Sequence, residues 1–166
     1  MTEVYLHLEG DRNPILIKLS NEKLTIGEIV KQHISTLVGN THEQHELKVF
    51  IEDEDELISL DVEFQQLKLK NRCHVHAHKC HKVDVHIVYN GIEKSLQEPP
   101  SSTIKKVKSK ALHLFDITKD DGMDLLLRLG SAEGEILQDD EHIGSLVSGP
   151  HCHVRLYLTP KKNVQG

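Results

Sequence analysis

The stretch VDVHIVYNGIEKSLQEPPSSTIKKVKSKALHL, residues 83–114, decides the fold of the chain. It opens with alternating apolar and polar residues, which is typical of a strand with one buried face. Asn90-Gly91 is a strong signal for a two-residue hairpin turn. Pro99-Pro100 ends the returning strand, because proline donates no hydrogen bond to a β-ladder. The stretch therefore begins with a predicted β-hairpin.

A helix is predicted directly after this hairpin. Ser102 or Thr103 is placed to cap its first turn. Apolar residues then recur at helical spacing, namely Ile104, Val107, Ala111 and Leu114. Three later apolar runs predict further strands: Leu125, Leu127 and Leu129; Ile136 and Leu137; and Val154, Leu156 and Leu158. Strand, strand, helix and then strands is the order of the β-grasp fold.

The same unit is written twice in the chain. The tripeptide Cys-His-Val at residues 73–75 recurs at 152–154, and Thr-Ile at residues 25–26 recurs at 103–104. The two spacings, 79 and 78 residues, agree within one residue. A repeat of this length in two copies indicates domain duplication, because solenoid repeats are usually shorter and more numerous.

The first copy carries its own signals for the same elements. Thr25 and Glu28 form a capping box at a predicted helix start. Apolar residues mark the predicted strands: Val4, Leu6 and Leu8; Ile15 and Ile17; Leu47, Val49 and Ile51; the short run from Leu57 to Leu60; and Cys73, Val75 and Ala77.

We therefore predict an α+β chain of two tandem β-grasp domains. The first domain spans residues 1–79 and the second spans residues 83–159. The linker, residues 80–82, is short enough to restrict the relative motion of the domains without fixing their angle. Residues 160–166 form a predicted flexible tail, because the apolar alternation stops before them.

Composition narrows the class of protein. The net charge is −6 and the Lys and Arg residues are dispersed, which excludes the basic face of a nucleic-acid binder. No apolar run approaches the ~18 residues of a membrane span. We expect a monomeric cytoplasmic protein that binds neither nucleic acid nor membrane. In that compartment Cys73, Cys80 and Cys152 are expected to be reduced rather than disulfide-bonded.

Short motifs in the second domain resemble ubiquitin. Glu98-Pro99 followed by STIKKVKSK at residues 102–110 is similar to the helix entry of ubiquitin. A Leu-x-Asp motif at residues 137–139 and the HVRLYL strand at residues 153–158 keep the same order. Two such domains with a glycine tail resemble the interferon-induced two-domain ubiquitin-like modifier of vertebrates. They also resemble its bacterial counterparts, which are encoded beside activating, conjugating and deconjugating enzymes in antiphage operons.

The resemblance implies a chemistry for the tail. An ATP-dependent, ubiquitin-activating-like enzyme would adenylate Gly166 and take it as a thioester. A ubiquitin-conjugating-like enzyme would then deliver it to target lysines, and a deconjugating protease would release it. Glycine suits this step, because it has no Cβ to block a narrow channel. The other tail residues are Lys161, Lys162, Asn163, Val164 and Gln165, and this single glycine departs from the two that often end such tails.

Strand alternation also places a candidate partner-binding patch. If Leu125 and Leu127 face the core, Leu126 faces outward, and by the same argument Arg155 and Tyr157 face outward on the last strand. An apolar centre with a polar edge is typical of binding surfaces, although a single exposed leucine needs no explanation. In the first domain Phe50 is the analogous outward residue, and it is placed to contact the second domain or a partner.

Histidines form a second cluster of interest among the 13 in the chain. His74, His76 and His78 alternate along one predicted strand and project from one face, with His7 on the adjacent strand. Three imidazoles suit Zn²⁺ or Ni²⁺, but neighbours two apart on a strand converge poorly. We therefore favour a solvated strand face and predict no metal site and no cofactor. The acidic run at residues 52–56 is likewise interpreted as a solvated turn.

No catalytic constellation is recognisable, so an enzyme is not predicted. The chain has no phosphate-binding glycine loop and no G-x-S-x-G motif. Each Cys-His pair lies on neighbouring strand positions, which point to opposite faces. The leading hypothesis is a conjugated modifier in antiviral defence. The alternatives are a tandem ubiquitin-like adaptor that acts only by binding and, more weakly, a histidine-dependent metal sensor.

Overall fold

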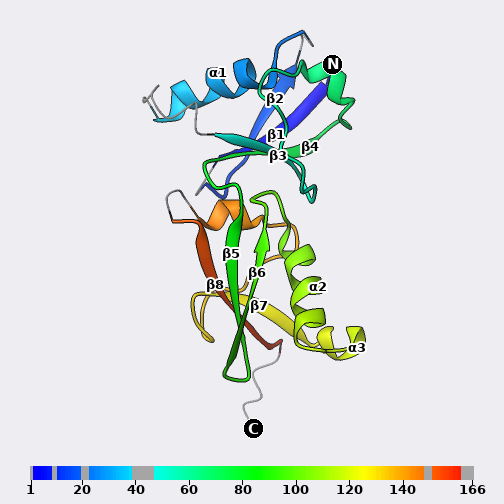
Figure 1. The fold of residues 1–166 in the computed structure, drawn as a ribbon, viewed down its shortest axis with the longest axis vertical. Helices are drawn as coiled ribbons and strands as arrows, with labels where there is room; N and C mark the ends of the chain where they lie inside the picture. Colours follow the sequence, from blue (N-terminus) through cyan, green and yellow to red (C-terminus); the bar gives the residue numbers. More distant parts are fainter. Residues whose placement is uncertain (1, 9–10, 20–22, 39–46, 148–150, 162–166) are drawn as a thin grey trace.

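The computed structural model describes residues 2–8, 11–19, 23–38, 47–147 and 151–161. They form two four-stranded sheets, one in each half of the chain (Figure 1). The first sheet has the order β2-β1-β4-β3 and the second has the order β6-β5-β8-β7. The strands are β1 Thr2–Leu8, β2 Ile15–Leu19, β3 Lys48–Ile51, β4 Cys73–His78, β5 Val83–Tyr89, β6 Ile92–Glu98, β7 Leu125–Leu129 and β8 His153–Pro160.

Helices complete the two units. They are α1 Ile26–Val38 in the first unit and α2 Ile104–Leu114 and α3 Lys119–Gly122 in the second, with 3-10 turns η2 Phe64–Leu67 and η3 Ile143–Leu146. In each sheet a parallel central pair, β1/β4 or β5/β8, lies between antiparallel outer strands. The prediction of two tandem β-grasp domains is confirmed. The predicted short strands near residues 58 and 136 are only single bridges, Val49 to Ile58 and Arg128 to Ile136.

Local sequence explains where the helices begin. At α1 the backbone N–H of Thr25 donates to Glu28 Oε2 at 3.0 Å, and the N–H of Glu28 donates to Thr25 Oγ1 at 3.2 Å. This is the predicted capping box, which satisfies two donors that a helix start leaves open. At α2 the hydroxyl of Thr103 accepts the N–H of Lys106 at 3.2 Å. The duplicated Thr-Ile dipeptide therefore starts a helix in both copies.

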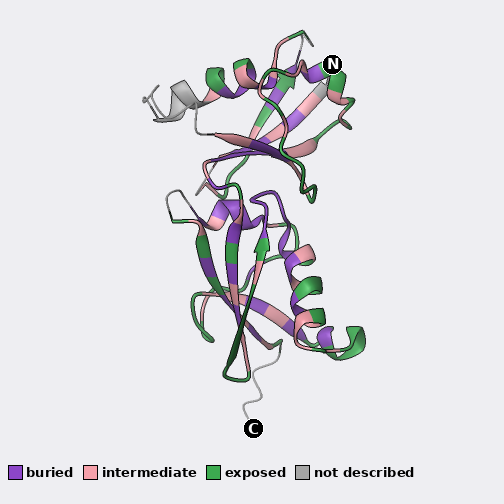
Figure 2. Ribbon diagram, viewed as in Figure 1, coloured by how far each residue is buried: buried purple, intermediate pink, exposed green. Residues whose placement is uncertain are grey.

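Each unit has its own apolar core between one sheet face and the helix. The first core includes Val4, Leu6, Ile17, Ile26, Ile29, Val49, Val75 and Ala77. The second includes Val83, Val85, Ile87, Ile104, Val107, Leu127, Leu156 and Leu158. Burial alternates along β5 and β8, as Figure 2 shows, because successive strand residues point to opposite faces.

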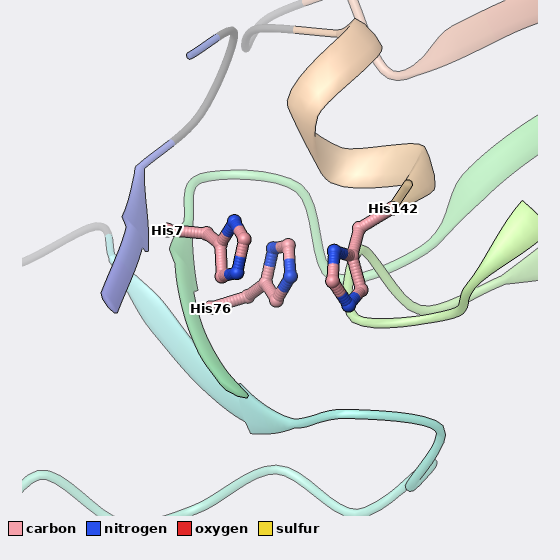
Figure 3. A group of neighbouring side chains, drawn as sticks. All are labelled: His7, His76 and His142. Atoms are coloured by element: carbon pink, nitrogen blue, oxygen red, sulfur yellow. The ribbon is translucent and has the colours of Figure 1, made fainter. Parts of the chain in front are cut away.

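The outer face of the first sheet is covered by the second unit. His7 and His76 are register partners on β1 and β4, and they are 4 % and 1 % exposed. Their rings meet His142, which precedes η3 in the second unit (Figure 3). His78 Nε2 lies 2.9 Å from the carbonyl oxygen of Gly144. The predicted solvated histidine face is wrong for these residues, because a second domain takes the place of solvent.

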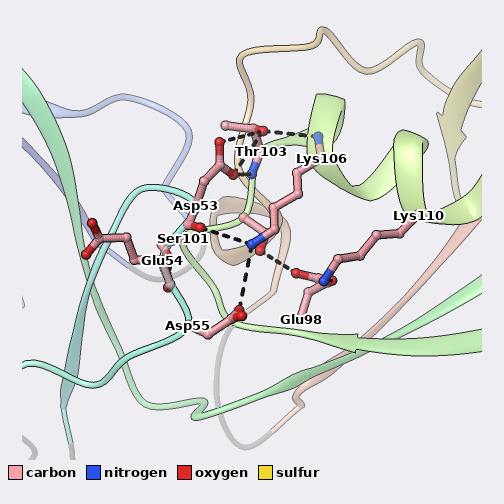
Figure 4. A network of polar contacts seen from close by, with 9 residues as sticks. Asp53, Glu54, Asp55, Glu98, Ser101, Thr103, Lys106 and Lys110 are labelled. Atoms are coloured by element: carbon pink, nitrogen blue, oxygen red, sulfur yellow. Dashed lines mark hydrogen bonds and ion pairs between the residues drawn. The ribbon is translucent and has the colours of Figure 1, made fainter.

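The acidic turn after β3 docks on the start of α2 (Figure 4). Asp53 Oδ1 accepts the N–H of Thr103 at 2.9 Å and its hydroxyl at 3.1 Å. Lys106 Nζ donates to the carbonyl oxygen of Asp53 at 3.0 Å. The N–H of Asp53 donates to the carbonyl oxygen of Ser101 at 3.1 Å. The turn remains largely exposed, but it is a domain contact and not only the solvated loop predicted.

A disulfide corrects the expectation of reduced cysteines. Cys80 and Cys152 are bonded, with Cα atoms 5.7 Å apart, whereas Cys73 is free. These two cysteines lead into β5 and β8, and the N–H of Asp84 donates to the carbonyl oxygen of Cys152 at 2.9 Å. Adjacent parallel strands thus bring them within disulfide range. The linker is thereby attached to the second unit, which limits domain motion beyond what its length alone imposes.

Among the described residues, no helix combines the length and apolar character needed to cross a membrane.

Candidate interaction face and strand end

The outer face of the second sheet is the open counterpart of the buried first face. Tyr157 lies between its register partners Val88 on β5 and Arg128 on β7. Leu126 pairs with Thr159, so it lies diagonal to Tyr157 on the same face. Leu126, Val88 and Tyr157 are half-buried. The face therefore has an apolar centre on three neighbouring strands.

Polar pairs surround this centre. Arg155 is exposed and its guanidinium lies 2.8 Å from a carboxylate oxygen of Glu93 on β6. His86 Nδ1 lies 2.9 Å from Ser95 Oγ, and Arg128 Nε donates to Thr159 Oγ1 at 3.2 Å. Exposed ion pairs of this kind add little to stability. They leave the charges available to a partner, so the surface combines an apolar centre with a polar rim.

The last strand leads away from the first domain (Figure 1). β8 continues to Pro160, and the N–H of Lys161 donates to the carbonyl oxygen of Asp124 at 2.7 Å. The ordered backbone thus extends two residues past Thr159, into the range predicted as tail. A cleft of about 370 Å³ lies here between α2 and β7, and Lys108 and Lys161 line it. Burial, and then the charge of Lys161, lowers the pKa of Lys108.

Three of the four predicted patch residues lie on the open face of the second sheet, and the fourth is buried at the junction. Leu126, Arg155 and Tyr157 share one face on neighbouring strands, as the alternation predicted. Phe50 does not belong to an open surface. It is fully buried and its ring lies 6.0 Å from that of His81, because its outward face meets the second unit. Phe50 therefore does not belong to a patch open to a partner, and its burial agrees with the other contact expected for it, with the second domain.

Of the predicted tail-site residues, only the first lies within the part of the chain that the structure describes. Lys161 is exposed at the end of the last strand. Lys162, Asn163, Val164, Gln165 and Gly166 lie outside the described residues.

Sequence reasoning missed the residues that join the two domains. Arg12 donates through Nε to Glu141 Oε1 at 3.0 Å and also pairs with Glu135. Within the second unit it also missed fully buried Glu98, which accepts the hydroxyl of Ser102 at 2.6 Å and pairs with Lys110 (Figure 4). The sequence carried one sign that the outer face of the first sheet is covered. It has histidines at positions 7, 76 and 78, where an open face usually has charged residues. Neutral imidazoles tolerate burial better than Lys or Glu.

Burial disfavours the protonated form of three imidazoles at the junction. Burial, and then repulsion from His142 and His74, lowers the pKa of His7 to about 3. Burial also lowers the pKa of His76 well below its ordinary value, and it lowers the pKa of half-buried His74. A protonated His7 or His76 would lose its hydration here without gaining an anionic partner of its own. At neutral pH these rings are therefore uncharged.

Two sheets, each with a parallel central pair and a helix on one face, define this chain as a tandem ubiquitin-like protein. Residues 84–161 match the family described as BilA ubiquitin-like domain 2. The resemblance drawn from the sequence, to tandem ubiquitin-like modifiers and their bacterial counterparts, is confirmed for the second domain by this match. No curated protein matches the chain.

Solved structures of ubiquitin-like proteins match one half of the chain. A ubiquitin of Caldiarchaeum subterraneum is 21 % identical, with a TM-score of 0.38, and the match covers 51 % of this chain and 99 % of that one. A designed protein based on ubiquitin is 16 % identical, with a TM-score of 0.38, and the match covers 51 % of this chain and 95 % of that one.

Proposed function

We propose that this chain is a ubiquitin-like modifier that is joined to target lysines through Gly166. An ATP-dependent activating enzyme would adenylate the Gly166 carboxyl group with release of pyrophosphate, and an enzyme cysteine would then displace AMP to form a thioester. A conjugating enzyme would then transfer it to a lysine amine, which forms an isopeptide bond and releases the thiol. In this role the chain is a substrate of enzymes rather than an enzyme. A cytoplasmic, antiphage setting belongs to the same proposal and rests on the resemblance to BilA.

The course of the last strand is the observation that carries the proposal. β8 ends at Pro160, on the side of the second domain remote from the first, so the first domain does not cover its exit. From Lys161 to Gly166 an extended chain spans roughly 3.3 Å per residue. In an extended conformation that length would carry the Gly166 carboxyl group roughly 15–20 Å beyond the sheet.

The open face of the second sheet supplies the recognition surface in this proposal. Leu126 and Tyr157 form an apolar centre for an activating or conjugating enzyme, or for a deconjugating protease, and Arg155 adds a charge at the rim. The matching positions of the first domain lie in the junction. Partners are therefore expected to bind the outer face of the second sheet, next to the tail, and not the equivalent face of the first sheet.

The test is reconstitution with activating and conjugating enzymes encoded beside the gene, ATP and a lysate. The intact chain is expected to give adducts of higher mass that are sensitive to removal of ATP. Deletion of Gly166 is expected to abolish them, whereas the exposed substitution Lys119→Ala on α3 keeps them. Adducts that persist after the deletion, or that never form, contradict the proposal and favour a tandem adaptor that acts by binding alone.

A further inference from the structure

Five metal-ligating side chains from both domains meet at the junction. His7 lies on β1 and His74 and His76 lie on β4, while Glu52 directly follows β3. His142 is the one contribution from the second domain, at the start of η3. Figure 3 shows His7, His76 and His142 converging from these separate elements. The cluster therefore exists only when the two domains are docked.

The distances divide the cluster into an inner and an outer set. One nitrogen from each of His7, His76 and His142 lies within 4.8 Å of the other two. Their ring centroids are 4.3 to 4.5 Å apart. Around them His7 Nε2 lies 2.7 Å from His74 Nδ1, and His142 Nε2 lies 2.6 Å from Glu52 Oε2.

The three inner rings are buried, and nitrogens of two of them lack partners. His7, His76 and His142 are 4 %, 1 % and 2 % exposed. His7 Nδ1 and both ring nitrogens of His76 have no hydrogen bond within the described part of the chain. Buried polar groups are nearly always satisfied, and an exception calls for an explanation such as a bound ion. Three orphaned nitrogens in one place point to a ligand shared between the rings.

The outer contacts have the form expected around metal-bound histidines. A ligating histidine normally uses its second nitrogen to donate to a carboxylate or another acceptor, which fixes the ring orientation. Here the second nitrogen of His142 faces the Glu52 carboxylate and that of His7 faces His74. In both residues this leaves Nδ1 for the ion. Neutral imidazole is also the form that binds metals.

An entry route lies beside the cluster. A cavity of about 160 Å³ is lined by His7, His74 and His142, and Asp140 and Glu141 lie on its wall. It has room for several water-sized species. Arg12 also lines the cavity and pairs with Glu141, so Asp140 is the carboxylate there that favours a cation. The cavity thus gives access to His7 and His142 without separation of the two domains.

We propose that the junction binds one Zn²⁺ ion through His7, His76 and His142, with Glu52 and His74 holding the ligand rings and water in the fourth position. Three imidazoles and one water form a familiar tetrahedral set for zinc, with Zn–N distances of about 2.0–2.1 Å. His7 and His76 lie face to face, with an interplanar angle of 1°. One of these rings must therefore turn before both lone pairs reach the same ion. The ion joins the first domain to the second.

The test uses the full chain without a polyhistidine tag, first freed of metal by a chelator. Calorimetric titration with Zn²⁺ is expected to give one tight, stoichiometric ion per chain and a rise in the thermal midpoint. His142→Ala is expected to weaken binding at least 100-fold. Glu52→Gln keeps the three ligands but removes the carboxylate, so a loss of about 10- to 100-fold is expected.

His86→Ala is the matched control, because His86 occupies in β5 the repeat position that His7 occupies in β1. It is expected to bind Zn²⁺ as the natural chain does. Co²⁺ in place of Zn²⁺ is expected to give the visible absorption of a tetrahedral site, and circular dichroism checks that each variant is folded. Weak or non-stoichiometric binding of the natural chain overturns the proposal. So does tight binding that folded His142→Ala retains.

Discussion

The outer face of the first sheet is buried and that of the second sheet is open, although both belong to the same repeated unit. In the first sheet His7 pairs with His76, and both are buried against the second domain. In the second sheet the matching pair is His86 and Arg155, which remain partly or fully exposed. The same strand position thus contacts the other domain in one copy and lies on an open surface in the other.

This difference teaches that strand alternation decides which side a residue occupies but not what covers that side. A buried imidazole takes the place of a charge on the face that became an interface, because His76 occupies in β4 the position that Arg155 occupies in β8. The second face keeps Arg155 and its ion pair with Glu93. Duplication therefore leaves one open outer face, next to the end of β8, and not two.

The largest effect on stability is expected from a charge placed on the covered face. Phe50→Asp puts a carboxylate where the side chain is fully buried, and it is expected to lower the free energy of unfolding by about 3–5 kcal/mol. Tyr157→Asp on the open face is expected to cost less than about 1 kcal/mol. Urea denaturation measures both. Equal losses would mean that the two faces are not differently covered.

A smaller effect is expected from pH in the metal-free chain. The pKa of His7 is lowered to about 3, while its unfolded value is about 6.5. The folded state thus binds fewer protons, so its stability is complete above pH 6.5 and is lost as the pH falls toward 3. Between pH 7 and pH 5 this one group costs about 2 kcal/mol.

Paired substitutions isolate the contribution of that histidine. His7→Phe removes the titrating group from the covered face and is expected to flatten the pH dependence of urea denaturation. His86→Phe, at the matching open position, is expected to leave it unchanged. The same slope in all three chains would exclude the buried imidazole as its source.

The smallest effect is expected at the edge of the junction. Asp53→Ala removes the acceptor for the N–H and hydroxyl of Thr103 at the start of α2. A lost helix-terminal hydrogen bond costs about 1 kcal/mol. Glu56→Ala in the same exposed turn is expected to change the unfolding free energy by less than about 0.5 kcal/mol. Equal, negligible changes would show that the turn contributes nothing to docking.

Much of each unit was predictable because its signals are local. The capping residues Thr25 and Thr103, the Asn90-Gly91 turn and the alternation along β5 depend on near neighbours in the chain. The same alternation placed Leu126, Arg155 and Tyr157 on one face of the second sheet. Local propensity and period carry this information because each acts over a few residues.

The cysteine and histidine predictions failed for a shared physical reason. Cys80 meets Cys152 across 72 residues of sequence, and His7 meets His142 across a domain boundary. No periodic pattern reports on such encounters. Phe50 was placed on the correct side of its strand, but its burial depends on the second domain. Each of these errors concerns what a residue contacts and not the element to which it belongs.

The sequence by itself determined two β-grasp units, their helix starts and the side of the sheet on which each strand residue lies, because those features follow from local periodicity and turn chemistry. Only the tertiary structure decided that one outer face is closed and the other is open. It also decided that a disulfide fastens the linker and that five possible metal ligands share one junction. These outcomes depend on how two folded surfaces meet, and residues brought together in that way leave no regular spacing in the chain.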